Sequence, residues 1–194
     1  MASPFYPPAK RCFDVVLALS LVPFVLPVAA LVALAIKLTS PGPALYWSQR
    51  MGAERRLFAM PKFRSMRVGT QAVATHLLQD ARSMLTPIGG FLRATSLDEI
   101  PQLWSVLRGD MSFVGPRPAL FNQDDLMALR DAAGVSALVP GITGWAQVNG
   151  RDELEIPAKV AIETEYLQRR SVTMDLRILV LTFVRVVRRE GVQH

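Results

Sequence analysis

The sequence is poor in the residues that build disulfides and histidine-based metal sites. It contains one cysteine, Cys12, and two histidines, His76 and His194. A single cysteine makes no internal disulfide and no zinc site, which fits a reducing cytoplasmic compartment. The two histidines stand alone, so a histidine metal cluster is excluded as well.

Familiar nucleotide and nucleic-acid patterns are also missing. The chain has no Walker A loop and no G-x-G-x-x-G. Aromatic residues make up only 8%, and they do not alternate with arginine as in proteins that bind single strands. The net charge of +6 and the pI of about 10.1 nevertheless indicate an anionic partner. Lipid phosphate or a nucleotide fits this better than nucleic acid.

Residues 15–36 form one long run without any charged residue. As a helix, the run would be about 33 Å long, which is enough to cross a bilayer. Pro23 and Pro27 lie near its middle, where each costs about 3 kcal/mol. The halves on either side reach only half way across, at about 1.5 Å per residue. The pattern therefore predicts a re-entrant segment, helix-break-helix, that enters and leaves the membrane on one side.

Basic residues on both sides of the run support this topology. They are Lys10 and Arg11 before the run, and Lys37, Arg50, Arg55 and Arg56 after it. Because cytoplasmic flanks are enriched in Lys and Arg, both ends are expected in the cytoplasm. A single span kinked at proline remains an alternative, since neighbouring groups can make proline tolerable. A cleaved signal peptide is disfavoured, because no small-residue cleavage site follows.

The rest of the chain predicts an α+β fold that is mostly helical. Residues 1–39 are the expected membrane segment, and residues 40–194 the expected cytoplasmic catalytic domain. A small β-hairpin is predicted at 44–50 and 57–64, with Pro61 restricting the second strand to an edge. Helices are predicted at 72–84, 101–107, 122–133 (with Asn122 as N-cap) and 156–169. Residues 108–120 and 139–151, rich in Gly and Pro, are predicted loops.

The C-terminal stretch 174–189 has an amphipathic pattern. Its apolar face consists of Leu176, Leu179, Val180, Phe183 and Val187, and its cationic face of Arg177, Arg185 and Arg188. This pattern is typical of an interfacial helix with its cations toward lipid headgroups. A core helix with a solvated basic edge fits the spacing equally well, and the apolar run elsewhere favours the interface.

Asp98 and Glu99 are the strongest candidates for chemistry, because phosphoryl transfer can use a carboxylate nucleophile and a carboxylate-bound metal. Two structural roles compete with this interpretation. Ser96 and Glu99 have the spacing of a capping box, which spacing alone favours. Alternatively, Pro101 begins a helix and places the carboxylates just before its positive end. The structural and catalytic roles do not exclude each other.

Cations recur around the acidic pair in the sequence. They are Lys62, Arg64, Arg93, Arg108 and Arg117. Pro116 and Pro118 restrict the backbone of Arg117, and fixed guanidinium groups suit phosphate oxygens. For any single arginine, a solvated basic loop is the simpler interpretation.

Five motifs occur in a fixed order along the chain. They are K-R-x-x-D at 10–14, K-F-R-S-M at 62–66, S-L-D-E-x-P-Q-L at 96–103, G-D-M-S-x-V-G-P-R-P at 109–118 and P-G-I-T-G-x-x-Q-V-N-G-R at 140–151. This set resembles the bacterial sugar transferase family, in particular the small monotopic polyprenyl-phosphate phosphoglycosyl transferases. The resemblance extends over nearly the whole chain.

The resemblance implies transfer of a sugar phosphate from a UDP-sugar to undecaprenyl phosphate, with release of UMP. An N-acetylated amino sugar is expected, in the first membrane step of bacterial glycoconjugate assembly. Asp98 would attack the β-phosphate and form a covalent intermediate, while Glu99 assists the incoming phosphate or the metal. The implied cofactor is Mg²⁺, held by Asp98 and Glu99. Lys62, Arg93 and Arg117 match positions that surround the phosphates.

Further expectations follow from the same resemblance. Gln147, Asn149 and Arg151 match a region linked with the nucleotide. Pro27 matches the proline of the family's membrane break, although Leu26 replaces the usual serine and Pro23 is additional. The implied location is the bacterial inner membrane, monotopic, with the catalytic domain facing the cytoplasm and anionic lipids around it. The chain has room only for the minimal catalytic unit, and a homodimer is allowed.

The sequence also allows one alternative from a different functional class. A non-enzymatic, basic, membrane-associated module that binds anionic lipid or nucleic acid would share the composition. Release of UMP from a UDP-sugar separates the two hypotheses, because a pure binding module releases none.

Overall fold

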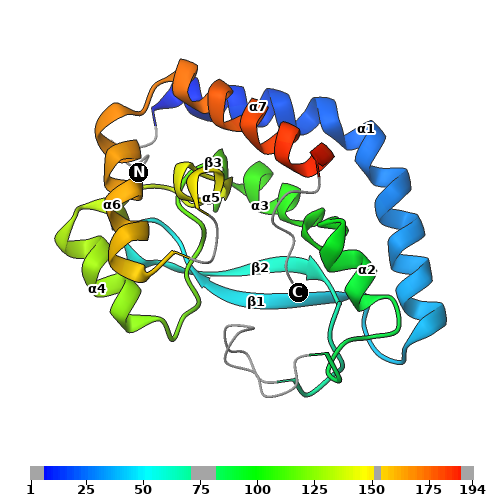
Figure 1. The fold of residues 1–194 in the computed structure, drawn as a ribbon. Helices are drawn as coiled ribbons and strands as arrows, with labels where there is room; N and C mark the ends of the chain where they lie inside the picture. Colours follow the sequence, from blue (N-terminus) through cyan, green and yellow to red (C-terminus); the bar gives the residue numbers. More distant parts are fainter. Residues whose placement is uncertain (1–6, 71–81, 151–153, 189–194) are drawn as a thin grey trace.

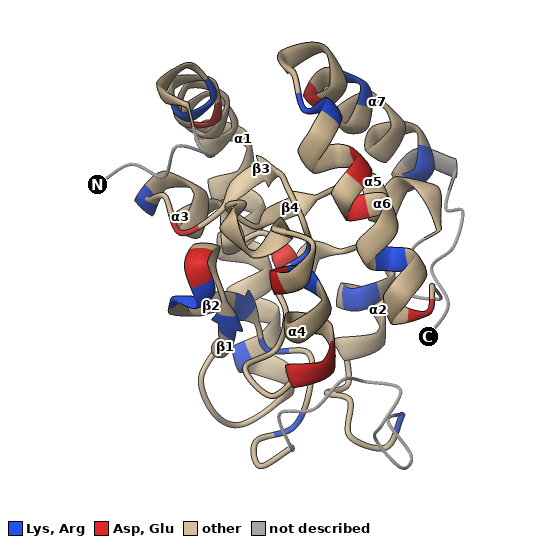
Figure 2. Ribbon diagram, turned by 90° about the vertical axis from the view of Figure 1, so that its left-hand side faces the viewer, with Lys and Arg blue, Asp and Glu red and all other residues tan. Residues whose placement is uncertain are grey.

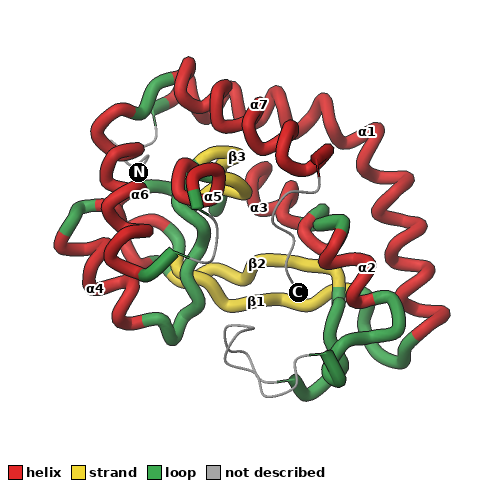
Figure 3. The backbone as a smooth tube through the Cα atoms, viewed as in Figure 1, coloured by secondary structure: helices red, strands yellow, loops and turns green. Residues whose placement is uncertain are grey.

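The computed structural model of the protein describes residues 7–70, 82–150 and 154–188, with side chains described up to residue 186. The first element is helix α1 (Pro8–Thr39), and the hairpin strands β1 (Leu45–Met51) and β2 (Leu57–Phe63) follow it. Short helices α2 (Gly89–Ala94) and α3 (Gln102–Arg108) come next. Figures 1 and 3 show the helices arranged around this small hairpin.

The remaining elements make up the second half of the chain. They are β3 (Ser112–Val114), α4 (Asp124–Ala132), β4 (Gly141–Thr143), α5 (Trp145–Asn149), α6 (Ile156–Arg169) and α7 (Val172–Arg188). Short 3₁₀ turns lie at Ala53–Arg55, Leu97–Glu99 and Val135–Ala137. The mostly helical α+β class is thus confirmed. Figures 1 and 2 place α7 and the first part of α1 at one end of the molecule, away from the hairpin.

The apolar run lies in one continuous helix, so the predicted separation into two helices is wrong. Helix α1 contains both Pro23 and Pro27, and Figure 1 shows that it bends along its length. The prolines are one turn apart and therefore remove backbone N–H groups from the same side of the helix. Such a local loss of hydrogen bonds bends a helix without ending it. Re-entry into a membrane stays a prediction.

The bend lets α1 pack against two parts of the core. Ala18 belongs to the main cluster, together with Val106, Met111 and Ile178. Further along α1, Val32 and Ile36 pack in a second cluster with Phe63 and Leu92. The outward side chains stay uncovered: Phe24 is 74% exposed and Leu38 77%. The helix is long and apolar enough to cross a membrane, and only 11% of its most apolar 18-residue stretch is buried.

Polar contacts fix both ends of α1 to the rest of the protein. Arg11 donates hydrogen bonds to the carbonyls of Val106 and Leu107 at the end of α3. The buried carboxylate of Asp14 accepts the backbone N–H of Phe113 at 3.2 Å. These contacts explain Arg11 and Asp14 of the K-R-x-x-D motif as attachments between α1 and the rest of the protein. At the other end, Arg64 binds the carbonyl oxygens of Ser40 and Pro41.

The predicted hairpin is confirmed. Strands β1 and β2 pair antiparallel, with Leu45 opposite Phe63 and Met51 opposite Leu57. Pro61 is tolerated in β2 because both strands of a two-stranded sheet are edges.

The prediction of loops at 108–120 and 139–151 is wrong in part, because each contains a short strand. Strands β3 and β4 pair parallel, and α5 follows directly. A Cβ atom on Gly115 would collide with the carbonyl oxygen of Val139, and one on Gly144 with the carbonyl oxygen of Gly115. The glycines that indicated turns therefore permit a close backbone approach.

Most predicted helices are found with small shifts. Helix α6 has the predicted bounds, and α3 is displaced by one residue. Helix α4 begins at Asp124 with Gln123 at the N-cap, so the assignment of Asn122 as N-cap is wrong. Most of the helix predicted at 72–84, including His76, lies outside the described residues.

Helix α7 divides its apolar side chains between two environments. Ile178 is fully buried in the main core, whereas Val172, Leu176, Val180 and Phe183 are exposed. The Arg177 guanidinium lies over the Trp145 ring of α5, 5.6 Å from its centroid. The helix thus has both a core face and an uncovered apolar face, and its location in a membrane interface stays a prediction.

Candidate active site

The acidic pair lies on the 3₁₀ turn Leu97–Glu99, between α2 and α3. Ser96, just before it, adopts the left-handed conformation (φ 55°, ψ 18°), which costs of order 1 kcal/mol or more outside glycine. The Ser96 side chain makes no capping hydrogen bond to the turn, so the predicted capping box is not formed. The Glu99 side chain instead accepts hydrogen bonds from other segments of the chain, so it does not cap the turn.

Glu99 joins three segments of the chain through one oxygen atom. Its Oε1 accepts a hydrogen bond from Lys62 Nζ at 2.7 Å and from Arg117 Nη2 at 3.1 Å. Lys62 lies on β2, and Arg117 lies in the loop after β3. The three side chains are between 15% and 30% exposed, so solvent screens these ion pairs only partly.

The two cations determine the charge of Glu99. Burial alone would raise the pKa of its carboxyl group, but Lys62 and Arg117, by charge and by hydrogen bond, lower that pKa far below its usual range. Because the pKa of Glu99 is lowered, its ionised form stabilises the fold at any pH above the ordinary glutamate pKa. This contribution is lost as the pH falls toward the folded-state pKa. Glu99 is therefore ionised at neutral pH.

Asp98 is in a different situation although it is the adjacent residue. It is only 7% exposed, and its carboxylate makes no hydrogen bond or salt bridge to the described residues. Burial raises the pKa of Asp98, and the Glu99 charge adds to this, while Lys62 is the strongest opposing influence. Arg93, in the last turn of α2, and Arg117 also lower it. Asp98 thus lies among cations, and none of the described residues neutralises it by a direct contact.

The structure therefore brings together five of the residues singled out by sequence: Lys62, Arg93, Asp98, Glu99 and Arg117. Figure 2 shows that Lys and Arg occur on both the hairpin and α2. The cluster can hold an anionic phosphate next to a carboxylate, which is what phosphoryl transfer requires.

The second group of candidate residues lies on α5. Gln147 donates to the Ile142 carbonyl at 3.3 Å, and its buried Oε1 has no hydrogen-bond partner among the described residues. Asn149 is exposed and donates to the Trp145 carbonyl. In the described part of the chain, no hydrogen bond links either of them to the acidic pair. Arg151 lies outside the described residues.

At this site the acidic pair, Asp98 and Glu99, supplies carboxylate donors for a metal ion. Across residues 7–70, 82–150 and 154–188, no group of three or more His, Cys, Asp or Glu side chains could hold a metal. Magnesium, however, commonly uses only one or two carboxylates and completes its coordination with water and substrate phosphates. Asp98 and Glu99 fit that mode, provided that a phosphorylated substrate supplies the other ligands.

Two further arginines near this site were missed by sequence reasoning. Arg50 Nη1 donates to the Pro118 carbonyl at 3.1 Å, and Arg130 Nη2 donates to the Arg117 carbonyl at 3.0 Å. Both therefore hold the backbone of the loop that carries Arg117. Neither lies in a recognisable motif, and contacts between such distant segments leave no local signal.

Comparison with known proteins assigns the family. The family model described as bacterial sugar transferase matches residues 5–189. The chain is 42% identical to the UDP-glucose:undecaprenyl-phosphate glucose-1-phosphate transferase of Escherichia coli K12, covering 89% of this chain and 39% of that protein. It is 37% identical to the undecaprenyl-phosphate galactose phosphotransferase of Salmonella typhimurium, covering 94% of this chain and 41% of that protein.

Length differs among these relatives. The chain spans only about two fifths of the two enzymes just named. By contrast, its 35% identity to the uncharacterized sugar transferase EpsL of Bacillus subtilis covers 95% of this chain and 90% of EpsL. The family match covers nearly the whole chain, and the ordered motifs and the clustered site agree with it. This chain therefore belongs to the bacterial sugar transferase family.

Proposed function

We propose that this protein transfers a sugar 1-phosphate from a UDP-sugar to undecaprenyl phosphate and releases UMP. The observation that carries the proposal is the unequal environment of the two carboxylates. Glu99 is held by Lys62 and Arg117, whereas the buried Asp98 beside it has no direct partner among the described residues. Two relatives named for this reaction, one with glucose and one with galactose, support the same reaction class.

The chemistry proceeds in two displacements at one phosphorus atom. A carboxylate oxygen of Asp98 attacks the β-phosphorus of the UDP-sugar, and the bond from that phosphorus to the bridging oxygen breaks, so UMP leaves. A phosphate oxygen of undecaprenyl phosphate then attacks the same phosphorus and breaks its bond to Asp98. The carboxylate is regenerated, and the lipid carries a diphosphate-linked sugar. A covalent route lets one pocket handle both phosphates in turn.

The cations around Asp98 hold the phosphates during both displacements. Lys62, Arg93 and Arg117 offset the negative charge of the diphosphate and of the incoming lipid phosphate. Asp98 and Glu99 would hold a Mg²⁺ ion together with the substrate, and the ion would supply further charge neutralisation. Glu99, ionised and fixed by its two partners, keeps Lys62 and Arg117 oriented toward the reacting atoms.

Helix α1 supports a membrane location for this reaction. A core helix of a soluble protein would be mostly buried, yet only 11% of the most apolar window of α1 is covered. We propose that α1 inserts in the bacterial inner membrane as a monotopic anchor and leaves the site on the cytoplasmic face. A water-soluble donor then meets a lipid-borne acceptor at the membrane surface.

The function is tested by assaying UMP release from a panel of donors. The purified protein in lipid particles, with undecaprenyl phosphate, should release UMP from at least one of UDP-glucose, UDP-galactose, UDP-N-acetylglucosamine and UDP-N-acetylgalactosamine. The amino-sugar donors test the expectation drawn from the family resemblance. No release from any donor, together with binding to anionic vesicles, would favour the binding-module alternative.

The topology of α1 is tested by cysteine labelling. In a Cys12→Ser background, Ala9→Cys and Leu38→Cys place one exposed thiol near each end of α1. Both thiols should react with an impermeant maleimide in inside-out vesicles, and neither in intact spheroplasts. Accessibility of the two positions from opposite sides would show a membrane span instead. Permeabilised cells, in which both positions should react, provide the control.

A further inference from the structure

The loop that carries Arg117 depends on contacts to its carbonyl groups. Pro116 and Pro118 flank Arg117, and neither has a backbone N–H with which to hold the loop. The carbonyls of residues 116, 117 and 118 instead accept hydrogen bonds from Gly141 N, Arg130 and Arg50. At residue 117 itself the contact comes from Arg130, on helix α4.

Arg130 is fixed in turn by a buried ion pair with Glu163 of α6. Arg130 Nε donates to Oε2 of Glu163 at 2.8 Å, and Nη2 donates to Oε1 at 2.5 Å. The two side chains are 5% and 2% exposed. Because Nη2 carries two hydrogens, it can bind Glu163 with one and the Arg117 carbonyl with the other. The bidentate pairing thus sets the guanidinium plane that directs an N–H at the loop.

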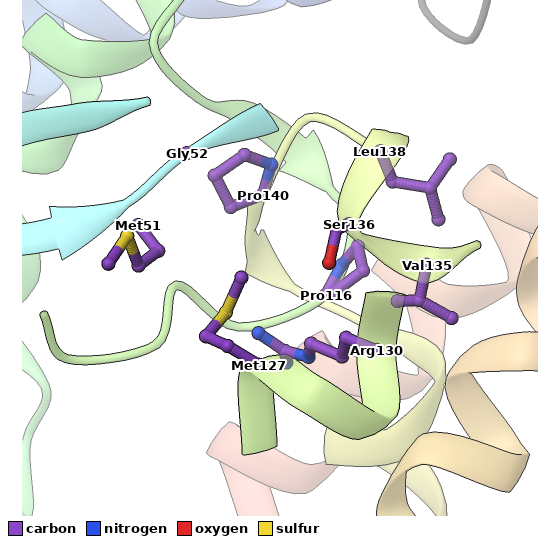
Figure 4. A pocket seen from close by; sticks show the side chains of 9 residues that line it. All are labelled: Met51, Gly52, Pro116, Met127, Arg130, Val135, Ser136, Leu138 and Pro140. Carbon is purple, nitrogen blue, oxygen red and sulfur yellow. The ribbon is translucent and has the colours of Figure 1, made fainter. Parts of the chain in front are cut away.

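Stability alone is a weak reason for such a pair. Removing two charges from water is costly, and buried ion pairs can often be replaced by apolar side chains without loss of stability. Figure 4 shows Arg130 next to Pro116 and Met127 at the wall of a small cavity. Where side chains leave space behind a loop, packing constrains it less, and a directed hydrogen bond contributes more to its position.

We propose that Arg130 and Glu163 are positioning residues for the reaction. Glu163 orients Arg130, Arg130 holds the Arg117 carbonyl, and the Arg117 side chain consequently points at Glu99 and the phosphates. Neither residue touches the reacting atoms. The inference rests on the proposed transferase function, since its kinetic consequence is a loss of phosphate transfer. The competing explanation is that the pair only ties α4 to α6.

Two variants test the pair without leaving a charge buried alone. Arg130→Met combined with Glu163→Leu removes both charges and keeps similar volume, so it should fold. Arg130→Lys keeps a cation for Glu163 but loses the planar fork that reaches the carbonyl. Arg117→Ala is the reference variant, because it removes the Arg117 side chain itself. Asp131→Asn, the neighbouring position on α4 with a partly exposed partner in Arg55, is the matched control.

The kinetic result expected is non-additivity. Arg117→Ala should lower kcat/KM about 100-fold. Each Arg130 variant should lower it about 10- to 100-fold in the wild-type background, as for a misplaced catalytic group. In the Arg117→Ala background the same variants should cost less than about threefold more, because their effect passes through Arg117. An equal loss in both backgrounds, or no loss in either, would overturn the proposal. Asp131→Asn should be unaffected.

Hydrogen exchange gives a second readout that needs no turnover. In the Arg130 variants, backbone amides in the loop region 115–121 should exchange faster, while those of α4 and α6 keep their protection. If α4 and α6 lose protection instead, the pair is only a structural tie. Should the wild-type protein release no UMP from any donor, the proposed function fails, yet this exchange pattern still decides whether the pair holds the loop.

Discussion

An Asp98→Asn protein should release no UMP above background, and no sugar phosphate should become attached to it. The amide is similar in size to the carboxylate but cannot act as the nucleophile, so the first displacement does not occur. Loss of a covalent nucleophile typically costs about 10⁴-fold or more. Radiolabelled UDP-sugar followed by denaturing electrophoresis should show an adduct on the wild-type protein only.

The matched control for this variant is Asp131→Asn, which makes the same chemical change at a partly exposed position on α4. It should keep both the turnover and the adduct. An adduct of normal yield on the Asp98→Asn protein would assign the nucleophile to another residue. A fold check is included, because Asp98 is buried and its replacement must not unfold the site. Circular dichroism and the melting temperature should match those of the wild type.

The pH dependence of turnover provides an independent check on the same assignment. Asp98 must be ionised to attack, and burial raises its pKa above the ordinary aspartate value. Activity should therefore be lost as the pH falls through this raised pKa, while Glu99 stays ionised. Lys62 is the strongest influence that lowers the pKa of Asp98. In a Lys62→Met protein, the loss of activity on acidification should therefore occur at a higher pH.

Removal of Mg²⁺ should stop the reaction almost completely. Two of the cations at the site, Lys62 and Arg117, are already paired with Glu99, so less of their charge is available to the diphosphate. A divalent ion held by Asp98 and Glu99 would supply several kcal/mol of transition-state stabilisation, or about 10³-fold in rate. UMP release in excess EDTA measures the effect.

The chelator experiment needs a matched control and a rescue. EDTA saturated with Mg²⁺ should leave activity intact, and adding excess Mg²⁺ should restore a chelated sample. Undiminished turnover in EDTA would remove the metal from the mechanism. The melting temperature of the substrate-free protein should change little, because the proposed ion depends on substrate phosphates for much of its coordination.

Local patterns predicted a large part of the fold. The amphipathic pattern predicted α6 with the bounds that the structure shows, and two stretches flanking a polar turn predicted the hairpin. These patterns reflect contacts between residues a few positions apart, which the sequence displays directly. The capping box at Ser96 and the loops at 108–120 and 139–151 were wrong or incomplete. At these places, Glu99 pairs with Lys62, which is distant in sequence, and the glycines permit the close approach of the parallel strands β3 and β4.

The continuous helix α1 illustrates the same limit. Two prolines at one-turn spacing predicted a break, but the structure accommodates both in a bent helix whose two parts pack on separate core clusters. Proline removes specific hydrogen bonds, and whether the helix ends or bends depends on what the flanking turns pack against.

The sequence by itself determined the ordered motifs, the apolar run, the hairpin and the acidic pair. Only the tertiary structure decided that Glu99 is paired, that Asp98 beside it has no direct partner among the described residues, and that Arg130 binds the Arg117 carbonyl. Lys62 and Glu99 are 37 positions apart, and Arg130 and Glu163 are 33 apart. Contacts of this range arise when separate elements pack into one core, and no local spacing encodes which charges then meet.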